Sequence, residues 1–426
     1  MAAADPGRPG RDEAADAAPL RADALAQSAL AGLRNPATIR ERCGHILQAV
    51  QRGDSAHFKV DERRLDAVAE RVATLTRARF PDLRVPYHSR WRHFEAGGVD
   101  RKGELDSSLK GLAVAEKAHA HIELTLVSVL LDAGAGPAWR YREAGSGLQL
   151  ARSEGLGVAS LRAFMAGRFS SDAAQPCRVD ALALKRIAEH DLREVFQVRD
   201  DNPLVGLAGR VQLLHRLGRA LSEQPAWFGA TGRPAGLIDV LTAGGAVTAG
   251  AILGALLQAF STIWPSGQVL HGLPAGDAWP HPAAGGAGPS AGWVPFHKLS
   301  QWLSYSLLEP LQWAGVPVGG LDQLTGLPEY RNGGLLLDGG VIVPRTNDHL
   351  RRPLRPEEEW VVEWRALTVA LLDALAPRVR ALLGAPDLPL ACILEGGTWA
   401  AGRQVAAELR PGGAPPVTLD SDGTLF

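Results

Sequence analysis

The sequence predicts a mainly α, multi-helical protein. Three observations support this prediction: long segments repeat apolar residues every three or four positions, very few runs alternate apolar with polar residues, and 46% of the 426 residues are hydrophobic. Apolar residues three and four apart share one face of a helix, whereas a half-buried strand needs a period of two. A chain with this length and composition can bury a substantial core.

The predicted helices follow one another along most of the chain. In the first strongly amphipathic one, apolar residues stand at Ile39, Cys43, Ile46, Leu47 and Val50. The same periodicity marks further predicted helices at 65–75, 109–131, 181–195, 204–221, 247–263, 296–313, 357–383 and 390–409. Strand-like runs are confined to 148–151 and 335–343, so at most a short β-hairpin is expected.

Two stretches of unusual composition divide the chain. Residues 1–20 are rich in Ala, Pro and Gly and predict a disordered tail. Residues 265–292 are rich in Pro, Gly and Ala and predict a long loop. The helical parts on either side, 21–264 and 293–426, are expected to complete one site.

The function of the loop at 265–292 stays open at this point. A lid over the site is one interpretation, because Asp277, Trp279 and His281 give the loop more chemistry than a passive linker needs. A surface insertion without a role is the other.

Charge and cysteine content exclude several classes of protein. Lys and Arg total 45 against 46 Asp and Glu, a formal charge of −1, so neither nucleic acid nor a membrane surface is expected as the main partner. Cys43, Cys177 and Cys392 lie far apart without CxxC spacing, which fits a reducing cytoplasm. No secretory signal and no apolar run of about 18 residues is found, which predicts a soluble, cytoplasmic protein.

The segment 320–338, GLDQLTGLPEYRNGGLLLD, has the composition of a site rather than a core. Pro328 favours extended structure before it, and Asn-Gly-Gly at 332–334 favours a turn where backbone can approach a ligand. An acid between them, Glu329, could face a pocket; a surface ion pair between Glu329 and Arg331 is the alternative. The candidate residues of this segment are Asp322, Glu329, Tyr330, Arg331 and Asp338.

The segment 87–94 is the densest polar and aromatic cluster. Its guanidinium groups could bind a phosphate bidentately while its rings stack on a planar group. Alternatively, the arginines pair with acids and the rings belong to the core. The candidate binding residues here are His88, Arg90, Trp91, Arg92 and His93.

Two further places could contribute to a pocket. Trp302, Tyr305 and Glu309 share one helix face, which is either a pocket wall or core with a buried ion pair. Asp132 ends a long apolar segment and is either a pocket carboxylate or a helix-terminal residue satisfied by backbone donors.

Several segments resemble the bacterial and fungal uracil-catabolism family of the URC/urg type. The segments are HSRWRHFEAGGVDR (88–101), LDAGAGPAWRYRE (131–143), RSEGLGVAS (152–160), FQVRDDNPLVGLAGR (196–210), PFHKLSQWLSYSLLEPL (295–311), 320–338, EWRALTVALLDALA (363–376), LEGGTWAAGR (394–403) and SDGTLF (421–426). This resemblance implies a role in uracil breakdown through a ribosylated, ring-opened intermediate.

A second resemblance supplies a reaction. Leu324-Thr325, Glu329-Tyr330-Arg331, Gly340-Val341 and Glu363-Trp364-Arg365-Ala366 are similar in order to the queuosine-salvage nucleosidases. That resemblance implies cleavage of an N-ribosidic bond on a helical scaffold like that of the helix-hairpin-helix DNA glycosylases. Glu329 stands where that family has Asp, so its carboxylate lies one methylene further along the side chain.

Together these observations predict a hydrolase that cleaves the N-ribosidic bond of a ring-opened uracil nucleoside or nucleotide. Glu329 would stabilise the ribosyl cation or activate water, with Asp322 and Asp338 in reserve. Arg331 and the pair Glu363/Arg365 would orient the carboxylate of Glu329. The expected substrate-binding residues are His88, Arg90, Trp91, Arg92, His93, His297, Trp302, Tyr305, Tyr330, Arg331 and Arg365.

Two alternatives come from other classes. One is a metal-dependent amidohydrolase or deaminase of the same pathway, with ligands from the pairs His88/His93 or His119/His121. Residues two apart on a helix do not face each other and no HExxH or Cys/His set is present, so neither a metal nor another cofactor is expected. The other alternative is a non-catalytic protein that binds a nucleotide or a pathway partner.

Overall fold

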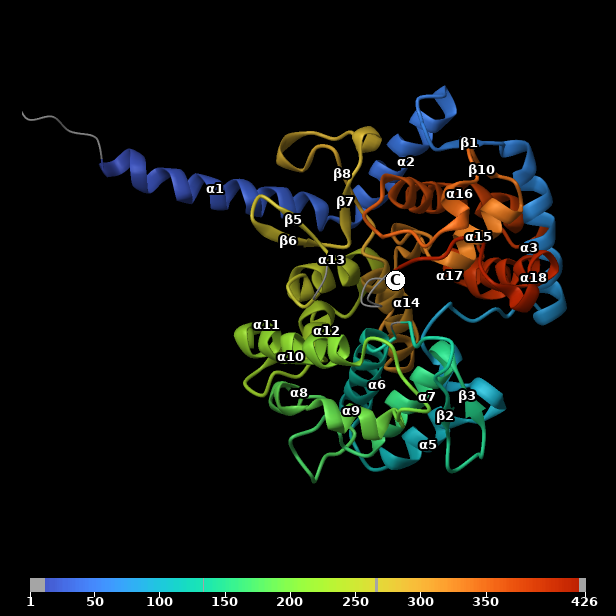
Figure 1. Ribbon diagram of the computed structural model, residues 1–426. Helices are drawn as coiled ribbons and strands as arrows, with labels where there is room; N and C mark the ends of the chain where they lie inside the picture. The colour runs from blue at the N-terminus through green and yellow to red at the C-terminus, as the bar shows by residue number, and fades with distance from the viewer. Residues whose placement is uncertain (1–11, 133, 265–266, 421–426) are drawn as a thin grey trace, which may run out of the picture.

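The computed structural model describes residues 12–420 except 133 and 265–266, with side chains from residue 23 onward. Residues 1–11 of the expected tail and the ending 421–426 lie outside the described residues. Residues 12–20 belong to the helix α1 (Asp12–Leu33), which projects from the body of the protein (Figure 1), and the expected disorder of this tail stays a prediction. Ala, the strongest helix former, is frequent in this stretch.

The prediction of a mainly α fold is confirmed. Most predicted helices agree with observed ones within a few residues, and 390–409 is divided by a π-helical turn at Leu394–Thr398. The helices after α1 are α2 (Pro36–Arg52), α3 (Leu65–Arg79), α4 (Trp91–Phe94), α5 (Arg101–Ser108), α6 (Val114–Leu130), α7 (Arg152–Met165), α8 (Ala181–Arg186), α9 (Glu189–Val195), α10 (Leu207–Glu223), α11 (Pro225–Phe228), α12 (Gly236–Thr242), α13 (Ala249–Phe260), α14 (Lys298–Trp313), α15 (Tyr330–Asp338), α16 (Glu359–Leu383), α17 (Leu390–Ile393) and α18 (Trp399–Leu409).

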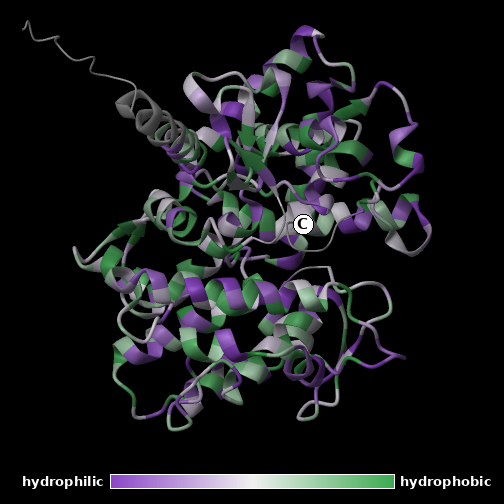
Figure 2. Ribbon diagram, turned by 60° about the vertical axis from the view of Figure 1, so that its left-hand side comes forward, coloured by the Kyte–Doolittle hydropathy of each residue, from purple (hydrophilic) through white to green (hydrophobic). Residues whose placement is uncertain are grey.

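The helices form two groups joined by α14. Figure 1 shows α2 and α3 beside α15 to α18 in one group and α5 to α12 in the other, with α14 between them. Helix α16 packs on both α2 and α3, and α14 packs on α6. The helices carry both hydrophobic and hydrophilic residues (Figure 2), as expected for amphipathic helices around a shared core. The first helices therefore lie with the last ones, and the division of the chain at 265–292 stays a prediction.

The strands are more numerous than the single hairpin expected. Within the described residues five two-stranded pairs form, β1–β10, β2–β3, β4–β9, β5–β6 and β7–β8; only β4–β9 is parallel. Their bounds are β1 (Phe58–Val60), β2 (Tyr141–Arg142), β3 (Gln149–Leu150), β4 (Val247–Thr248), β5 (Gln268–Leu270), β6 (Leu273–Gly276), β7 (Ala278–Pro280), β8 (Trp293–Pro295), β9 (Val318–Gly319) and β10 (Ile342–Pro344). Strands of two to four residues are too short to show a period of two in the sequence.

The segment 265–292 contains β5, β6 and β7 rather than an irregular loop. It packs against α1 through a small apolar cluster that includes Leu30, Leu33 and Leu270. Asp277 fastens it to α16 through a buried ion pair with Arg365. None of its described residues lines the candidate site below, and a lid role stays a prediction.

No helix in the described part of the chain combines the length and the apolar character that a membrane crossing requires.

Close packing of α18 on α15 depends on glycine. A Cβ atom at Gly402 would lie 2.3 Å from the backbone oxygen of Arg331, far inside the contact distance of real side chains. Helix α15 begins beside Glu329, so this packing also fixes the place of the candidate acid.

We expect Gly402→Ala to lower the free energy of unfolding by about 1–3 kcal/mol, because the two helices must move apart. Gly44→Ala is the matched control: Gly44 lies inside α2, and a Cβ there meets no atom within 4 Å. Alanine should stabilise that helix by about 0.5–1 kcal/mol. Chemical denaturation of both variants measures the difference; equal stability of the two would contradict the packing argument.

Candidate active site

Two neighbouring cavities lie where the two helix groups meet α14. The inner cavity has a volume of about 70 Å³ and is lined by His88, His93, Asp132, Ser153, Lys298, Trp302, Leu327, Glu329, Tyr330 and Trp399. The outer cavity has a volume of about 770 Å³ and is lined by His88, Arg92, His93, Ala96, Gly97, Gln149, Leu150, Ala151, Arg152, Glu154, Glu395, Trp399, Arg403 and Gly412. His88, His93 and Trp399 line both, so they form the wall between the cavities.

Glu329 is held at the start of α15. Its side chain accepts hydrogen bonds from the backbone N–H groups of Arg331 at 2.7 Å and Asn332 at 2.6 Å, as an N-cap residue does. Burial raises the pKa of Glu329, and the two backbone donors oppose that shift. The carboxylate is therefore fixed in orientation, and lone pairs beyond those two bonds are available on the cavity side.

Asp132 provides a second carboxylate in the inner cavity. It follows α6, and its Oδ1 lies 3.0 Å from Nη1 of the fully buried Arg90. Burial alone would raise the pKa of Asp132, but the charge of Arg90 holds it below its usual value. Asp132 is thus a pocket carboxylate that stays ionised.

His93 is a neutral hydrogen-bond donor in the same cavity. Its Nδ1 lies 3.0 Å from Nη1 of Arg90, and because a guanidinium only donates, Nδ1 accepts and the ring proton resides on Nε2. Burial, together with the charge of Arg90, lowers the pKa of His93 to about 3. The imidazole therefore remains neutral at ordinary pH.

Lys298 and Trp399 line the cavities although sequence reasoning did not select them. Lys298 begins α14 and is a single cation between apolar and aromatic neighbours, a pattern with no signal of its own. Trp399 begins α18 directly after the π-helical turn; such turns are frequent at functional sites, but this one is seen only in the structure. Burial lowers the pKa of Lys298.

The structure brings six of the predicted residues to the cavities. They are His88, Arg92, His93, Trp302, Glu329 and Tyr330. Two of these six residues have acidic partners. The carboxylate of Glu395 lies 2.9 Å from Nδ1 of His88, and Glu309 and Glu95 pair with Arg92.

Other predicted residues support the cavities from behind. Arg90 contacts Asp132, His93 and the carbonyl of Ser153, so it positions inner-cavity residues without lining the cavity. Arg365 pairs with Asp277, and its Nε lies 3.4 Å from the carbonyl oxygen of Pro328, next to Glu329.

The remaining predicted residues have structural partners elsewhere. Trp91 packs in the core against Phe94 and Trp313, the Tyr305 hydroxyl donates to the Thr325 carbonyl, and His297 bonds the Leu33 carbonyl. Arg331 donates to the Gly413 carbonyl, Asp338 pairs with Arg410, and Asp322 is exposed on the surface.

Glu363 and Arg365, expected to act as a pair, have separate partners in the structure. Arg365 binds Asp277 in bidentate fashion at 2.7 and 2.9 Å, and Glu363 bonds Ser55 and His281. Glu329 is likewise oriented by the backbone N–H groups of Arg331 and Asn332, and not by the guanidinium of Arg331. Adjacent residues on a helix point in different directions, so proximity in sequence did not produce these contacts.

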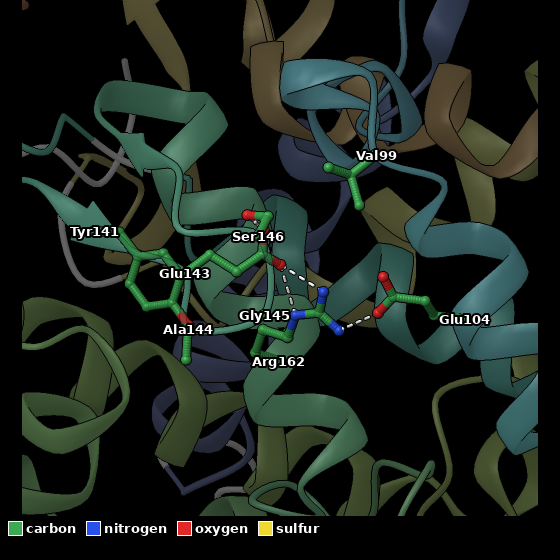
Figure 3. Close-up of a pocket in the computed structure, with 8 residues that line it drawn as sticks. All are labelled: Val99, Glu104, Tyr141, Glu143, Ala144, Gly145, Ser146 and Arg162. Atoms are coloured by element: carbon green, nitrogen blue, oxygen red, sulfur yellow. Dashed lines mark hydrogen bonds and ion pairs between the residues drawn. The ribbon is translucent and has the colours of Figure 1, made fainter.

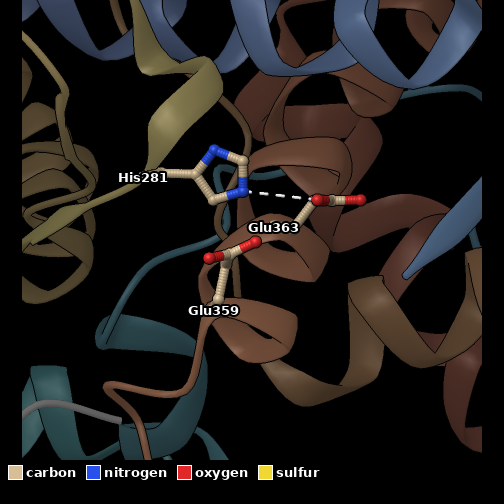
Figure 4. Close-up of side chains that lie close together, drawn as sticks. All are labelled: His281, Glu359 and Glu363. Atoms are coloured by element: carbon tan, nitrogen blue, oxygen red, sulfur yellow. Dashed lines mark hydrogen bonds and ion pairs between the residues drawn. The ribbon is translucent and has the colours of Figure 1, made fainter. Parts of the chain in front are cut away.

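One imidazole and two carboxylates form a candidate metal centre. These side chains, His281, Glu359 and Glu363, lie close together (Figure 4). The backbone N–H of Ala283 donates to Nδ1 of His281, so the ring proton resides on Nε2, which lies 3.3 Å from Glu363. A metal ion would need the lone pair that this proton occupies. The cluster fits a hydrogen-bonded link between the end of β7 and α16 better than a metal centre.

A third cavity, of about 440 Å³, shares no lining residue with the other two; Figure 3 shows the residues around it. Its charged groups are paired with one another: Glu143 accepts from Arg101, Arg162 and Ser146, and Arg162 also bonds Glu104. This pairing leaves few groups for a ligand.

The hydrogen bonds from Arg101 and the other donors lower the pKa of Glu143 to about 2. A lowered folded-state pKa gives stability that is complete above the unfolded-state pKa and lost as the pH falls toward the folded-state value. We expect Glu143→Gln to destabilise the protein by about 3 kcal/mol at pH 7 because two buried or partly buried guanidiniums lose their partner. The difference from wild type should shrink between about pH 4.5 and pH 2.

Melting temperatures across this pH range measure the effect, with the exposed Glu70→Gln as control. A difference that is constant with pH would contradict the role of the Glu143 carboxylate.

Comparison with known proteins adds to this geometry. The family described as "Protein of unknown function (DUF1688)" matches residues 32–426. The chain belongs to this family. It is 37% identical over 427 residues to "Uracil catabolism protein 4" of Lachancea kluyveri, covering 91% of this chain and 97% of that protein. It is 39% identical over 402 residues to "Protein urg3" of Schizosaccharomyces pombe, covering 91% and 96%. The resemblance inferred from sequence segments is therefore confirmed.

Proposed function

We propose that this family member acts in uracil catabolism, as a cytoplasmic hydrolase that cleaves the N-ribosidic bond of a ring-opened uracil nucleoside or nucleotide. The name of the Lachancea kluyveri relative supports the pathway. The observation that carries the reaction is the inner cavity, where the carboxylates of Glu329 and Asp132 line one small space with a neutral imidazole and several aromatic rings.

Cleavage of an N-ribosidic bond builds positive charge on the anomeric carbon. A carboxylate held in place before the reaction stabilises that charge without reorganising. Glu329 meets this requirement because two backbone N–H groups fix it. Its raised pKa also makes it a stronger base toward water than an ordinary carboxylate.

The size of the cavities fits a small substrate. A cavity site for one water needs about 10–15 Å³, so the inner cavity of about 70 Å³ can hold a small polar group and a water. The outer cavity of about 770 Å³ lies within the usual range for ligand sites of roughly 300–1,000 Å³. Trp399 in the wall, with the Arg403 guanidinium 4.8 Å from its ring, offers a surface for the sugar.

Turnover by chelator-treated protein tests the proposal. Purified protein is incubated with ribosylurea and with its 5′-phosphate, with uridine and uracil as controls, while urea and reducing sugar are measured. We expect both products in equal amounts from at least one ribosylurea substrate without added metal. Turnover that requires added zinc or iron, or ammonia release in place of urea, would contradict the proposal and favour an amidohydrolase or deaminase.

A further inference from the structure

Lys298 is a cation inside the candidate site that faces the carboxylates of Glu329 and Asp132 across the inner cavity without a direct hydrogen bond to either. Two other cations of the interior have direct carboxylate partners: Arg90 pairs with Asp132, and Arg365 pairs with Asp277. Among the described residues no hydrogen bond or ion pair reaches Nζ of Lys298; its nearest recorded contact is the Trp302 ring, 6.0 Å from the ring centre. Lys298 is half-buried, and an ammonium that lines a cavity without a direct partner is free to donate to a ligand there.

A second donor in the same cavity also lacks a partner. Trp302 lies one helical turn after Lys298 on α14, its side chain is 4% exposed, and its indole N–H has no acceptor within the described residues. The Nε2 proton of His93, whose ring packs edge-on against Trp302 with centroids 5.6 Å apart, adds a third donor. Three donors therefore line a space of about 70 Å³ that also contains the carboxylates of Asp132 and Glu329.

This set of groups matches one chemical class of ligand. A ureido group, –NH–CO–NH₂, presents a carbonyl oxygen that accepts hydrogen bonds and N–H groups that donate them. The carbonyl oxygen suits the donors Lys298, Trp302 and His93, and the N–H groups suit Asp132. A group of four heavy atoms also fits the volume, with the sugar extending toward the outer cavity.

We propose that the inner cavity binds the ureido end of the substrate and that Lys298 is a catalytic residue that protonates the leaving group. This inference rests on the proposed function. The C1′–N bond breaks and its electron pair moves to the departing urea, which receives a proton from Lys298. Water adds to C1′ and gives its proton to Glu329, and the proton returns to Lys298 through solvent. Ribosylurea and water thus become ribose and urea.

The pKa of Lys298 fits this role. It is lowered by burial, which brings a lysine closer to the pH range in which it can release a proton. Neutral methionine of similar length should remove the acid while leaving the fold intact, because no hydrogen bond or ion pair of the described residues reaches Nζ.

The test compares Lys298→Met with the control Lys110→Met, an exposed lysine outside the cavities. We expect Lys298→Met to lower kcat/KM for ribosylurea about 10²–10⁴-fold, the usual contribution of general acid catalysis. Its melting temperature should equal or exceed that of wild type. The fall of wild-type kcat/KM at high pH should vanish in the variant. Lys298→Cys treated with 2-bromoethylamine, which rebuilds an ammonium side chain, should regain activity.

Binding of N-methylurea, measured by saturation-transfer NMR, separates this inference from the proposed function. Wild-type binding that Lys298→Met loses supports the ureido site, even if ribosylurea is not turned over and the proposed reaction is wrong. Equal binding by both proteins, or by neither, overturns the ureido assignment. Turnover by Lys298→Met at the wild-type rate with an unchanged pH profile overturns the catalytic role while leaving the ribosidase proposal in place.

Discussion

Replacing Glu329 with glutamine is expected to lower kcat for ribosylurea about 10²–10³-fold, the usual effect of removing one preorganised electrostatic group. Glutamine keeps the length of the side chain but lacks the charge that stabilises the ribosyl cation and the basicity that activates water. KM should change little, because the interaction develops mainly in the transition state. Steady-state kinetics on purified protein measures both parameters.

Glu329 also caps α15, so a matched control must separate stability from chemistry. Asp180 is suited to this: it is buried, caps α8, and accepts backbone hydrogen bonds from Ala183 at 3.0 Å and Ser171 at 2.7 Å, yet lines neither cavity. Asp180→Asn and Glu329→Gln should each lose about 0.5–2 kcal/mol of stability. Only the second should lose activity. A loss of activity in Asp180→Asn as large as in Glu329→Gln would assign the effect to helix capping.

The second large effect is expected at Arg365. Arg365→Met should lower the free energy of unfolding by about 3–5 kcal/mol, because it leaves the carboxylate of Asp277 buried without its partner. Adding Asp277→Asn should recover part of this loss, since the unpaired charge is then removed. Recovery should be incomplete because Asp277 also accepts from the backbone N–H of Lys298 and from Trp279.

Lowering the pH should also reduce the stability of the wild-type protein, because it protonates Asp277. The charge of Arg365 overcomes burial and lowers the pKa of Asp277 to about 2. Stability from the pair is therefore complete above the ordinary Asp value near 3.9 and lost as the pH falls toward about 2. Denaturation curves at a series of pH values measure this loss of stability. A penalty for Arg365→Met that stayed constant down to pH 2 would show that packing, rather than the ion pair, accounts for the loss.

The sequence was informative where periodicity or local chemistry carries the signal. The long amphipathic helices were predicted because their apolar stripes extend over several turns. Glu329, His88 and His93 were selected because polar and aromatic residues cluster there with Pro or Gly nearby, although His93 itself lies in the short helix α4. The strand expected at 335–343 is only partly present: Ile342 and Val343 belong to β10, whereas 335–338 complete the helix that Glu329 caps.

Contacts between distant segments could not be predicted from spacing. Arg365 pairs with a residue 88 positions away in the sequence. Asp132, which follows α6, pairs with Arg90, which precedes α4. Lys298 was missed because one lysine before an apolar helix looks like any helix start. Its importance depends on its place in the inner cavity and on the absence of a direct carboxylate partner among the described residues. Both are visible only in the three-dimensional structure.

The most direct measurement is ¹³C NMR of the protein acting on ribosylurea labelled at C1′ and at the ureido carbonyl. The account predicts that the C1′ resonance moves from the N-linked riboside to free ribose while the carbonyl label appears as urea, with chelator present. Conversion of the carbonyl label to bicarbonate while C1′ remains bound to nitrogen would contradict it, because the protein would then cleave the ureido amide and not the ribosidic bond.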